Sequence, residues 1–471
     1  MDAFNIILKK VKKGQHRFTL NDAVVFSGLS IDDVRNALDL MIERYTCRLQ
    51  LTENADLIYN FGAKLRRRNN KSFKELWESI LKTAWKSFTI IFKVWLTITL
   101  VVYFTLFVIL LIALLISSQS SKRGGRSQGP QFGRLVYIFS SIFRWQTHSG
   151  TILQGRDRQG YPYSKYKPSE SILKPQKKNL IASVYDFVFG PSRVESDPDH
   201  DQREIAAFLR KKKGIIVRTD IEALTGRNSP HAEHLFTECL IRFNGTVHVN
   251  DNGVIYGRFD NLLRSSGNVE TEEVIYYWDE YEPEYELTGN SGARNGFIFF
   301  MNGVNLFISY LILSGSLYTA ASTTEAAPFL YLILDLPLLF GWVPFIFSAL
   351  FYIIPLVRWL RNHQLSKKRR KNNIRKRIFR VIYQNTLNSY ATDYILRAIN
   401  SAASEENLSA DIIKRMMDEL VLDQDGELII SDNASIEYTF PQINLEQSEV
   451  EHIRSSSRPE TSLGQIILDA D

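Results

Sequence analysis

Cysteine is scarce in this chain, and the common catalytic motifs are missing from it. Among 471 residues there are two cysteines, Cys47 and Cys239, which fall at non-equivalent positions of two different repeats. Such a pair does not form a disulfide framework and is compatible with a reducing compartment. The sequence has no Gly-rich phosphate loop, no Cys-x-x-Cys, no His-Glu-x-x-His and no Gly-x-Ser-x-Gly. We therefore predict that the protein is not an enzyme and holds no cofactor.

A complete set of metal ligands is also lacking. His231 and His234 lie three residues apart on a predicted helix and could form half of a zinc site. Cys239 lies on the same helix but is turned by about 140° from His234. No second ligand pair at zinc spacing occurs nearby. We therefore expect no metal site.

The chain lacks a strong net charge and a recognisable signal core at its start. The 57 Lys and Arg residues oppose 51 Asp and Glu residues, which gives a formal net charge of +6. So small an excess matters only where the basic residues cluster. The apolar run at residues 4–8 is too brief for a signal-peptide core. We expect internal apolar segments to direct membrane insertion.

Three long apolar segments are present, at residues 94–116, 297–321 and 326–357. The first has 23 residues without a charge, Pro or Gly. At 1.5 Å per residue this is about 35 Å of helix, enough to cross a hydrocarbon core of about 30 Å. The second and third are joined by a short turn and are interpreted as a helical hairpin. The sequence therefore predicts about three transmembrane segments.

The orientation of these segments is not settled by their flanking charges. The basic run after the third segment, without acidic residues, predicts a cytoplasmic C-terminus. Eight basic residues between 64 and 86 favour the same side for the N-terminus, which three crossings do not allow. Either the N-terminal domain is exported, or one segment fails to cross. Pro337, Pro344 and Pro355 make a re-entrant third segment the candidate for the second alternative.

The candidate site residues are charged residues beside or within the apolar segments. The membrane-proximal basic residues are Arg66, Arg67, Arg68, Lys367, Lys368, Arg369, Arg370 and Lys371, which topology and anionic lipid explain. Asp335 falls within the third segment, where a carboxylate is a functional candidate. The interpretation that we favour places Asp335 at the interface, as a helix-start residue just before Pro337.

Outside the apolar segments, one pattern occurs three times. Each copy has a helix, a short strand or extended link, two further helices and a hairpin, which is the element order of a winged helix. The hairpins end in similar strands, Leu-Ile-Tyr-Asn-Phe61, Val-Ile-Tyr-Gly-Arg-Phe259 and Ile-Glu-Tyr-Thr-Phe440. We therefore predict an α-helical membrane protein with three α+β winged-helix-like domains.

These observations divide the chain into eleven parts. The repeats are predicted at residues 1–63, 201–263 and 374–443. Basic juxtamembrane segments are predicted at 64–93 and 358–373, a linker with amphipathic pieces (135–145 and 180–189) at 117–200, and an acidic aromatic linker at 264–296. The amphipathic pieces are expected either on the membrane surface or packed on protein. The aromatic linker is expected in the headgroup zone, with an interaction surface as the alternative. Residues 444–471 are expected to be a disordered tail, apart from a short apolar tip at 463–468.

The third helix of each repeat carries more acidic than basic residues, as at Asp32, Asp33, Asp39 and Glu43 in the first repeat. An acidic recognition helix is repelled by DNA, so nucleic acid is the less favoured partner. We predict a scaffold or adaptor that binds a partner protein, or a second copy, at the bilayer. A membrane-tethered transcription regulator and a transporter subunit stay open as alternatives.

The middle third of the chain carries a resemblance to known proteins. It rests on Ser183-Val-Tyr-Asp-Phe-Val-Phe-Gly190 followed by 204–226, and on Thr288-Gly-Asn290 entering Asn302-Gly-Val-Asn-Leu306. These stretches resemble uncharacterised multi-pass membrane proteins of bacteria and plastids. The resemblance implies no activity and no functional residue. It favours a bacterial cytoplasmic membrane, with a plastid membrane as the alternative.

Overall fold

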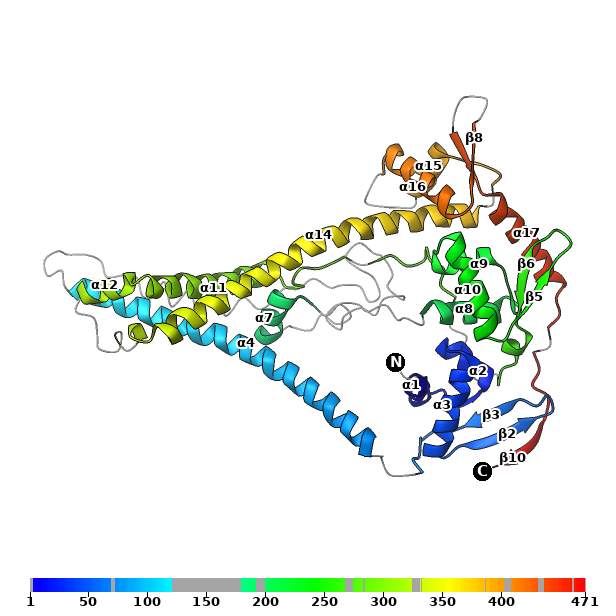
Figure 1. Cartoon of the computed structure of the whole chain (residues 1–471), viewed down its shortest axis with the longest axis horizontal. Coiled ribbons are helices and arrows are strands. Elements are labelled where there is room, and N and C mark those ends of the chain that lie inside the picture. The colour runs from blue at the N-terminus through cyan, green and yellow to red at the C-terminus, as the bar shows by residue number, and fades with distance from the viewer. Residues whose placement is uncertain are drawn as a thin grey trace.

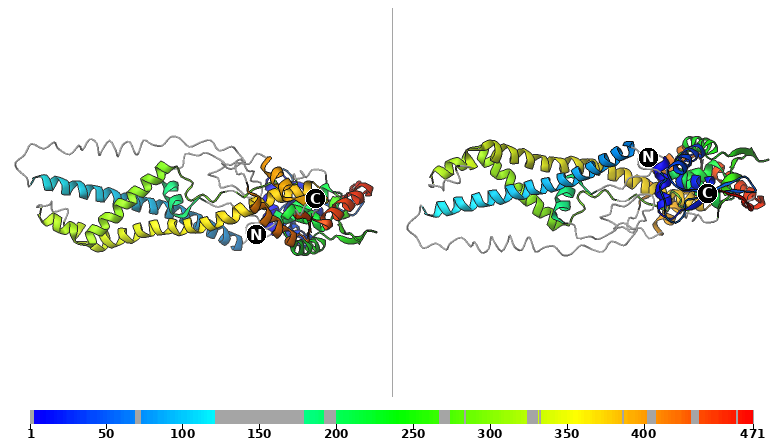
Figure 2. Two further views of the ribbon diagram at one scale, coloured as in Figure 1. Left: turned by 90° about the horizontal axis from the view of Figure 1, so that it is seen from above. Right: turned by 90° about the horizontal axis from the view of Figure 1, so that it is seen from below.

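The computed structural model places a long helical stem at one end of the molecule and a compact head at the other, where both termini lie (Figure 1). Two further views show the same elongated shape (Figure 2). The described residues are 3–68, 73–120, 179–191, 200–266, 274–282, 284–323, 331, 333–385, 387–401, 408–430, 436–459 and 461–470. They are mostly helical, with three small antiparallel sheets.

The stem is built from α4 (Phe73–Ser120), α11 (Gly292–Leu313) and α14 (Val343–Gln384), with a π-helical turn at Leu338–Trp342 and a short α12 (Ser316–Thr323) near the tip. Among the described residues, three helical stretches are long and apolar enough to cross a membrane: Thr83–Leu114, Gly292–Leu313 and Leu338–Gln384. The expectation of three apolar spans is confirmed in this form.

Two of the three prolines of the third segment lie inside the helical stretch Leu338–Gln384 without breaking it, and the re-entrant alternative stays a prediction. Pro337 stands immediately before the π-helical turn, and Pro344 follows that turn at the start of α14. Pro355 lies inside α14, which continues through it. The helical stretch Leu338–Gln384 is therefore continuous and runs on into the head.

Buried amides join the stem helices to one another. Asn302 of α11 donates from Nδ2 to the Ser348 carbonyl of α14 (3.0 Å), and Asn305 donates to the Leu100 carbonyl of α4 (3.1 Å). Hydrogen bonds of this kind stabilise the packing of apolar helices in a bilayer, where the hydrophobic effect does not favour helix–helix contacts over contacts with lipid. Both asparagines belong to the stretch that carries the resemblance.

The first part of the head, unit 1 (residues 3–68), follows the predicted order. Its elements are α1 (Ala3–Lys12), β1 (Arg17–Thr19), α2 (Leu20–Ser27), α3 (Ile31–Arg44), β2 (Arg48–Thr52) and β3 (Leu57–Asn60). Thr19 and Asp22 form a capping box at the start of α2, and Gly28 ends that helix with φ of 74°. Strand β3 lies between β1 and β2.

Unit 2 (residues 200–266) and unit 3 (residues 374–440) repeat this arrangement. Unit 2 contains α8 (His200–Lys211), β4 (Ile215–Ile216), α9 (Arg218–Thr225), α10 (Ser229–Arg242), β5 (Thr246–Val249), β6 (Ile255–Arg258) and a 3₁₀ turn (Asp260–Leu263). Unit 3 contains the end of α14, β7 (Tyr390–Ala391), α15 (Thr392–Ser401), α16 (Ala410–Asp423), β8 (Glu427–Ile430) and β9 (Ile436–Thr439). In every sheet, the second hairpin strand lies in the middle.

The tail after unit 3, expected to be disordered, is ordered where it is described. Helix α17 (Pro441–Ser456) lies on unit 2, and β10 (Ile466–Ala470) pairs antiparallel with β2 of unit 1. We call residues 441–470 the strap, because they join all three units. The strap is polar in composition, and only a few of its side chains, among them Ile443 and Val450, are buried. The sequence therefore did not indicate that it packs on the head.

The described parts of the two linkers that carry α7 and Trp278 are also packed against protein. Helix α7 (Leu180–Phe189) lies against α4, α11 and α14, so this amphipathic piece packs in the stem; the other, at 135–145, is outside the described residues. In the aromatic linker, Trp278 is buried against the core of unit 3 and stacks on Tyr276. The headgroup-zone expectation is therefore wrong for Trp278, because these rings fill the space between units 2 and 3.

All three units lie at the same end of the stem. Units 1 and 2 share a hydrophobic core cluster and a buried ion pair between Asp22 and Arg210 (2.9 Å). Helices α4 and α11 both run from the head toward the tip (Figure 1).

We expect protease added to the head side of sealed vesicles to cleave unit 1 and unit 3 alike. The packing of unit 1 on unit 2 keeps them on one side of any bilayer that the stem crosses. Epitope tags at the two termini and immunoblotting report the cleavage, and detergent-opened vesicles serve as the control. Protection of the N-terminal tag in vesicles that lose the C-terminal tag would contradict the packing of units 1 and 2.

A candidate protein-binding cleft

Arg218, at the start of α9, lies at the centre of an ionic cluster between unit 2, unit 3 and the strap. Its NH1 donates to Asp425 Oδ2 (2.9 Å) and to Ser229 Oγ, while its Nε lies 3.5 Å from Glu446 Oε1. Glu446 also accepts from the backbone N–H and the hydroxyl of Thr219. Because the guanidinium reaches carboxylates from unit 3 and from α17, Arg218 fixes both of them to unit 2.

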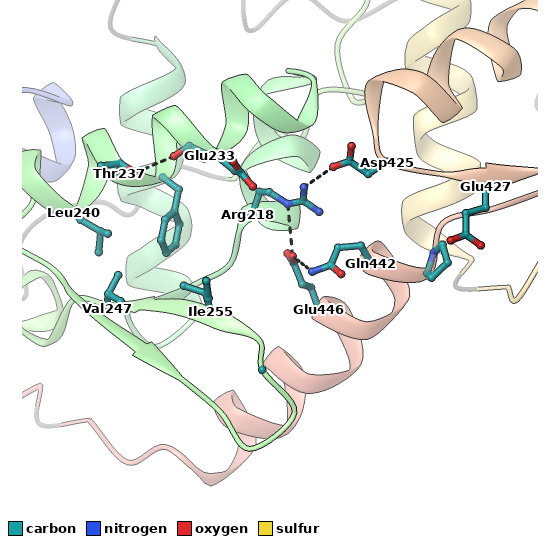
Figure 3. Close-up of a pocket in the computed structure, with 13 residues that line it drawn as sticks. Arg218, Glu233, Thr237, Leu240, Val247, Ile255, Asp425, Glu427, Gln442 and Glu446 are labelled. Carbon is teal, nitrogen blue, oxygen red and sulfur yellow. Dashed lines mark hydrogen bonds and ion pairs between the residues drawn. The ribbon is translucent and has the colours of Figure 1, made fainter.

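A cleft of about 830 Å³ opens beside this cluster. One wall is apolar: Leu240 of α10 faces Val247 and Ile255 of the hairpin (Figure 3), and Phe236 also lines the cleft. The other wall comes from unit 3 and α17, with Asp425, Glu427, Pro441, Gln442 and Glu446. The volume lies in the range of binding pockets, and seven of the thirteen lining residues are charged or polar, so the cleft combines an apolar wall with a polar one.

The charge of the cleft lining is negative. Glu233, Asp425, Glu427 and Glu446 oppose the single cation Arg218, so the formal charges of the lining residues leave an excess of three negative charges. The hydrogen bond from Ser229, together with Arg218, holds the pKa of Asp425 below its ordinary value despite some burial. The cleft is therefore suited to an apolar segment with basic flanks, and it repels polyanions.

Glu222 of α9 lies on the buried side of Arg218. Its Oε1 is 3.6 Å from Arg218 Nε, and its Oε2 accepts from the Tyr383 hydroxyl of α14 (2.8 Å). Burial raises the pKa of Glu222 to about 7, although Arg218 and Tyr383 act in the opposite direction. Burial likewise raises the pKa of Tyr383, with a further contribution from Glu222. Near neutral pH this carboxyl is close to its titration midpoint.

We expect the wild-type chain to lose stability as the pH rises from 5 to 8, because Glu222 ionises, and the Glu222→Gln variant to lose less. The folded-state pKa lies above the ordinary value, so the stabilisation is complete below about pH 4.5 and is lost as the pH rises through 7. A change of pKa from 4.5 to about 7 corresponds to at most about 3 kcal/mol. Glutamine keeps the acceptor for Tyr383 and does not titrate.

Thermal unfolding of the detergent-solubilised chain at pH 5 and pH 8 measures this effect, with Glu233→Gln as an exposed control. The difference in melting temperature between the wild type and Glu222→Gln should shift in favour of the variant at pH 8. An equal deficit of the variant at both pH values would show that the ionised Glu222 is needed as a partner of Arg218.

A second buried ion pair fastens the strap. Arg454 of α17 donates from NH2 to Asp220 Oδ2 (2.5 Å) and to the Ile215 carbonyl (2.9 Å). Its guanidinium also lies over the Phe208 ring, 5.3 Å from the centroid. Asp220 accepts in addition from the Val217 N–H (3.0 Å), which caps α9. Burial raises the pKa of Asp220, and Arg454 counteracts that shift.

The predicted basic residues of α14 have mixed roles. Lys367, Lys368 and Arg370 are exposed, between the apolar part of the helix and unit 3. Arg369 donates from Nε to the Glu282 carbonyl (2.7 Å), and Lys371 lies 2.7 Å from Glu419 of α16. This run therefore also anchors the aromatic linker and unit 3, which charge patterning alone did not reveal.

Arg66, Arg67 and Arg68 lie at the exit of unit 1, before the start of α4. The Arg66 carbonyl accepts from the Thr46 N–H (2.9 Å), and the Arg68 N–H donates to the Arg44 carbonyl (2.8 Å). The guanidinium of Arg67 lies 5.9 Å from the centre of the Tyr45 ring. The three side chains are exposed or half-buried beside the C-terminal end of α3.

Asp335 is exposed and lies in a turn, two residues before Pro337. Its backbone N–H donates to the Tyr331 carbonyl (2.7 Å). Figure 1 places the α12 end of the stem farthest from the head, and the turn precedes the π-helical segment there. Asp335 therefore lies just before the helical stretch Leu338–Gln384, and its placement at a membrane interface stays a prediction.

The predicted half-site for zinc is not completed by the residues that the structure describes. His231 bonds through Nδ1 to Asn228 Oδ1 (2.5 Å), and Cys239 is buried in the core of units 1 and 2. Burial raises the pKa of the Cys239 thiol to about 12. Within the described ranges, no group of three or more His, Cys, Asp and Glu residues could hold a metal ion.

The stretches that carry the resemblance meet in the stem. Asn290 donates from Nδ2 to the Ser183 carbonyl (2.9 Å), and Arg294 donates to Ser183 Oγ (2.9 Å). Arg358 of α14 donates to the carbonyls of Val188 (2.6 Å) and Leu287, and a Cβ at Gly190 would lie 3.1 Å from its guanidinium. These residues form one polar junction between α7, the start of α11 and α14.

Comparison with known proteins finds a distant relative. An uncharacterised chloroplastic protein of Arabidopsis thaliana is 22% identical over 386 residues, which cover 77% of this chain and 68% of that protein. No protein-family profile and no solved structure match the chain. The similarity confirms, in this coarse form, the expected resemblance to uncharacterised plastid proteins, and with three apolar helices it fits a membrane protein.

Proposed function

We propose that the chain is a non-enzymatic, membrane-anchored adaptor whose head binds a partner protein in the cleft of unit 2. The observation that carries this proposal is the cleft itself, with its apolar wall at Leu240, Val247 and Ile255 and its acidic opposite wall. Buried ion pairs hold the three units and the strap together, so the cleft is preformed. A preformed site loses little entropy on binding.

The proposal includes the winged-helix character of the three units. Its support is the shared order of elements and the shared sheet, in which the second hairpin strand lies between the first hairpin strand and a short strand before the second helix. Winged helices place the third helix and the hairpin on one surface. In unit 2, that surface forms the apolar wall of the cleft.

Charge favours a protein partner over nucleic acid. The exposed face of α3 carries Asp32, Asp33, Asp39 and Glu43, and the exposed face of α10 carries Glu233. These carboxylates would approach the phosphates if the third helices entered a DNA groove, which costs binding free energy. We propose that the stem lies in a plastid membrane or a bacterial cytoplasmic membrane, with the head on the stromal or cytoplasmic side.

A capture experiment tests the adaptor function. The solubilised chain with Val247→Asp should lose a partner that the wild type retains, because a carboxylate on the apolar wall opposes burial there. The control Leu57→Asp makes the same apolar-to-acidic change at an exposed leucine of unit 1, and this variant should retain the partner. Retention by both variants would exclude the cleft. Salt-sensitive retention of duplex DNA by the wild type would support a transcription regulator instead.

A further inference from the structure

The first strand of each hairpin forms the outer edge of its three-stranded unit; in unit 1 this edge is covered by β10, and among the described residues the other two edges pair with no further strand. These edges are β2, β5 and β8, and each pairs on its inner side with the second hairpin strand. The registers make the three edges equivalent: Arg48 faces Asn60, Thr246 faces Arg258, and Glu427 faces Thr439, and each of these partners stands one residue before the final Phe of its hairpin. An unpaired edge presents N–H and C=O groups that another extended segment can satisfy.

The edge of unit 1 shows what such a segment is like. Strand β10 pairs antiparallel with β2, with Asp469 opposite Gln50. Asp469 accepts from Arg48 Nε and NH2, both at 2.7 Å, and from Gln50 Nε2 at 3.1 Å. The segment that pairs with the hairpin edge of unit 1 is therefore an aliphatic strand with one charged residue, Asp469, which is opposite in sign to Arg48, the first residue of the edge.

Strand β8 of unit 3 is the most apolar of the three edges. Leu428, Ile429 and Ile430 are 56%, 47% and 78% exposed. Among the residues that the structure describes, β8 pairs with β9 alone. Three exposed aliphatic residues in succession on an edge strand are avoided in natural sheets unless another chain or element covers them.

The chemistry of the occupant follows from the equivalence of the edges. Glu427 and Ile429 stand where β2 has Arg48 and Gln50. A residue at the position of Asp469 would lie over Ile429 and next to Glu427. Lysine or arginine suits both neighbours, because its methylene stem covers the isoleucine and its charge reaches the carboxylate.

We propose that the β8 edge binds an extended aliphatic segment of a partner protein that carries a lysine or arginine facing Glu427. The segment adds a fourth strand to the sheet of unit 3, as β10 does in unit 1. The proposal rests on the adaptor function given above and adds a second docking element to it. It shares Glu427 with the acidic wall of the cleft but does not use the apolar wall in unit 2.

The test uses the full-length solubilised chain and two labelled peptides. One peptide has the sequence of residues 461–471, and the other carries Asp469→Lys; fluorescence anisotropy reports their binding. We expect the Asp469→Lys peptide to bind more tightly to the wild type. Glu427→Lys should weaken binding of the Asp469→Lys peptide about tenfold, because the opposite-charge pair becomes a like-charge pair. The same variant should bind the native peptide more tightly, because Asp469 then faces a lysine.

Two controls separate the strand-pairing mechanism from simple charge attraction. Asp411→Lys makes the same charge change at an exposed residue of α16 and should leave both affinities unchanged. N-methylation of alternate peptide amides should abolish binding, because it removes donors from the ladder. Equal affinities of the two peptides, or no effect of Glu427→Lys, would overturn the proposal.

Self-association of the chain that disappears in Glu427→Lys would also overturn it, because the occupant would then be a second copy. Val247→Asp distinguishes this proposal from the adaptor function. If that variant loses its partner but binds the Asp469→Lys peptide normally, the cleft and the β8 edge act separately. If the wild type captures a partner but binds neither peptide, the adaptor function stands and the edge proposal fails.

Discussion

Arg454→Met is expected to lower the free energy of unfolding of the head by about 3–5 kcal/mol at pH 8. Arg454 is 6% exposed, and methionine keeps most of its volume over the Phe208 ring. The substitution therefore removes the charge rather than the packing. Asp220 would stay buried without its cation, and an uncompensated buried carboxylate is costly.

The pH dependence separates this loss from a packing defect. Burial already raises the pKa of Asp220, and without Arg454 the rise is larger. A raised folded-state pKa contributes stability at low pH that is lost as the pH increases, so the deficit of the variant should be smaller at pH 5 than at pH 8. Thermal unfolding at both pH values measures it, with the exposed Arg458→Met as control. Equal deficits would assign the effect to lost packing.

The local elements were predictable because their signals lie within a few residues of one another. Thr19 with Asp22, and Gly28 after Ser27, mark both ends of α2, and the structure has the helix at Leu20–Ser27 as expected. The turn between β5 and β6 uses Asn250, whose Oδ1 accepts from the Asn252 and Val254 N–H groups. Capping residues, turn residues and hydrophobic periodicity all act at this short range.

The contacts that assemble the head were not predictable in this way. Thr219 and Glu446 are separated by 227 residues, and Arg454 meets Asp220 across 234. A single sequence contains no signal for such pairs, since any exposed Glu or Arg of a polar helix has the same local pattern. The strap therefore looked like a disordered tail, although it closes the cleft and covers one sheet edge.

The aromatic linker illustrates a signal with two interpretations. Tyr and Trp next to an apolar helix favour the headgroup zone, but they also fill large gaps between domains. Gly226 shows which case applies, because a Cβ there would lie 2.5 Å from the ring of Tyr277, and φ is +68°. The glycine that ends α9 thus leaves the space in which the Tyr277 ring packs. Only the structure brings these residues together.

Asp22→Ala is expected to destabilise the contact between units 1 and 2 by about 3–5 kcal/mol, more than the loss of a helix cap alone, which costs about 1 kcal/mol. Asp22 is fully buried and accepts from the Thr19 N–H (3.0 Å) and the Ser266 N–H (3.1 Å). It also pairs with Arg210, whose side chain is 8% exposed. The alanine variant leaves two buried donors and a buried cation short of an acceptor.

Hydrogen exchange followed by mass spectrometry should show this as faster exchange in both α2 and α8, because the ion pair joins the two helices. Asp22→Asn retains an acceptor for the cap and removes the charge, so it isolates the ion pair with Arg210. Asp32→Ala, at an exposed residue of α3, should change exchange in neither helix. If Asp22→Ala affects α2 alone, the carboxylate acts as a helix cap within unit 1, and the shared apolar core by itself holds the two units on one side of the membrane.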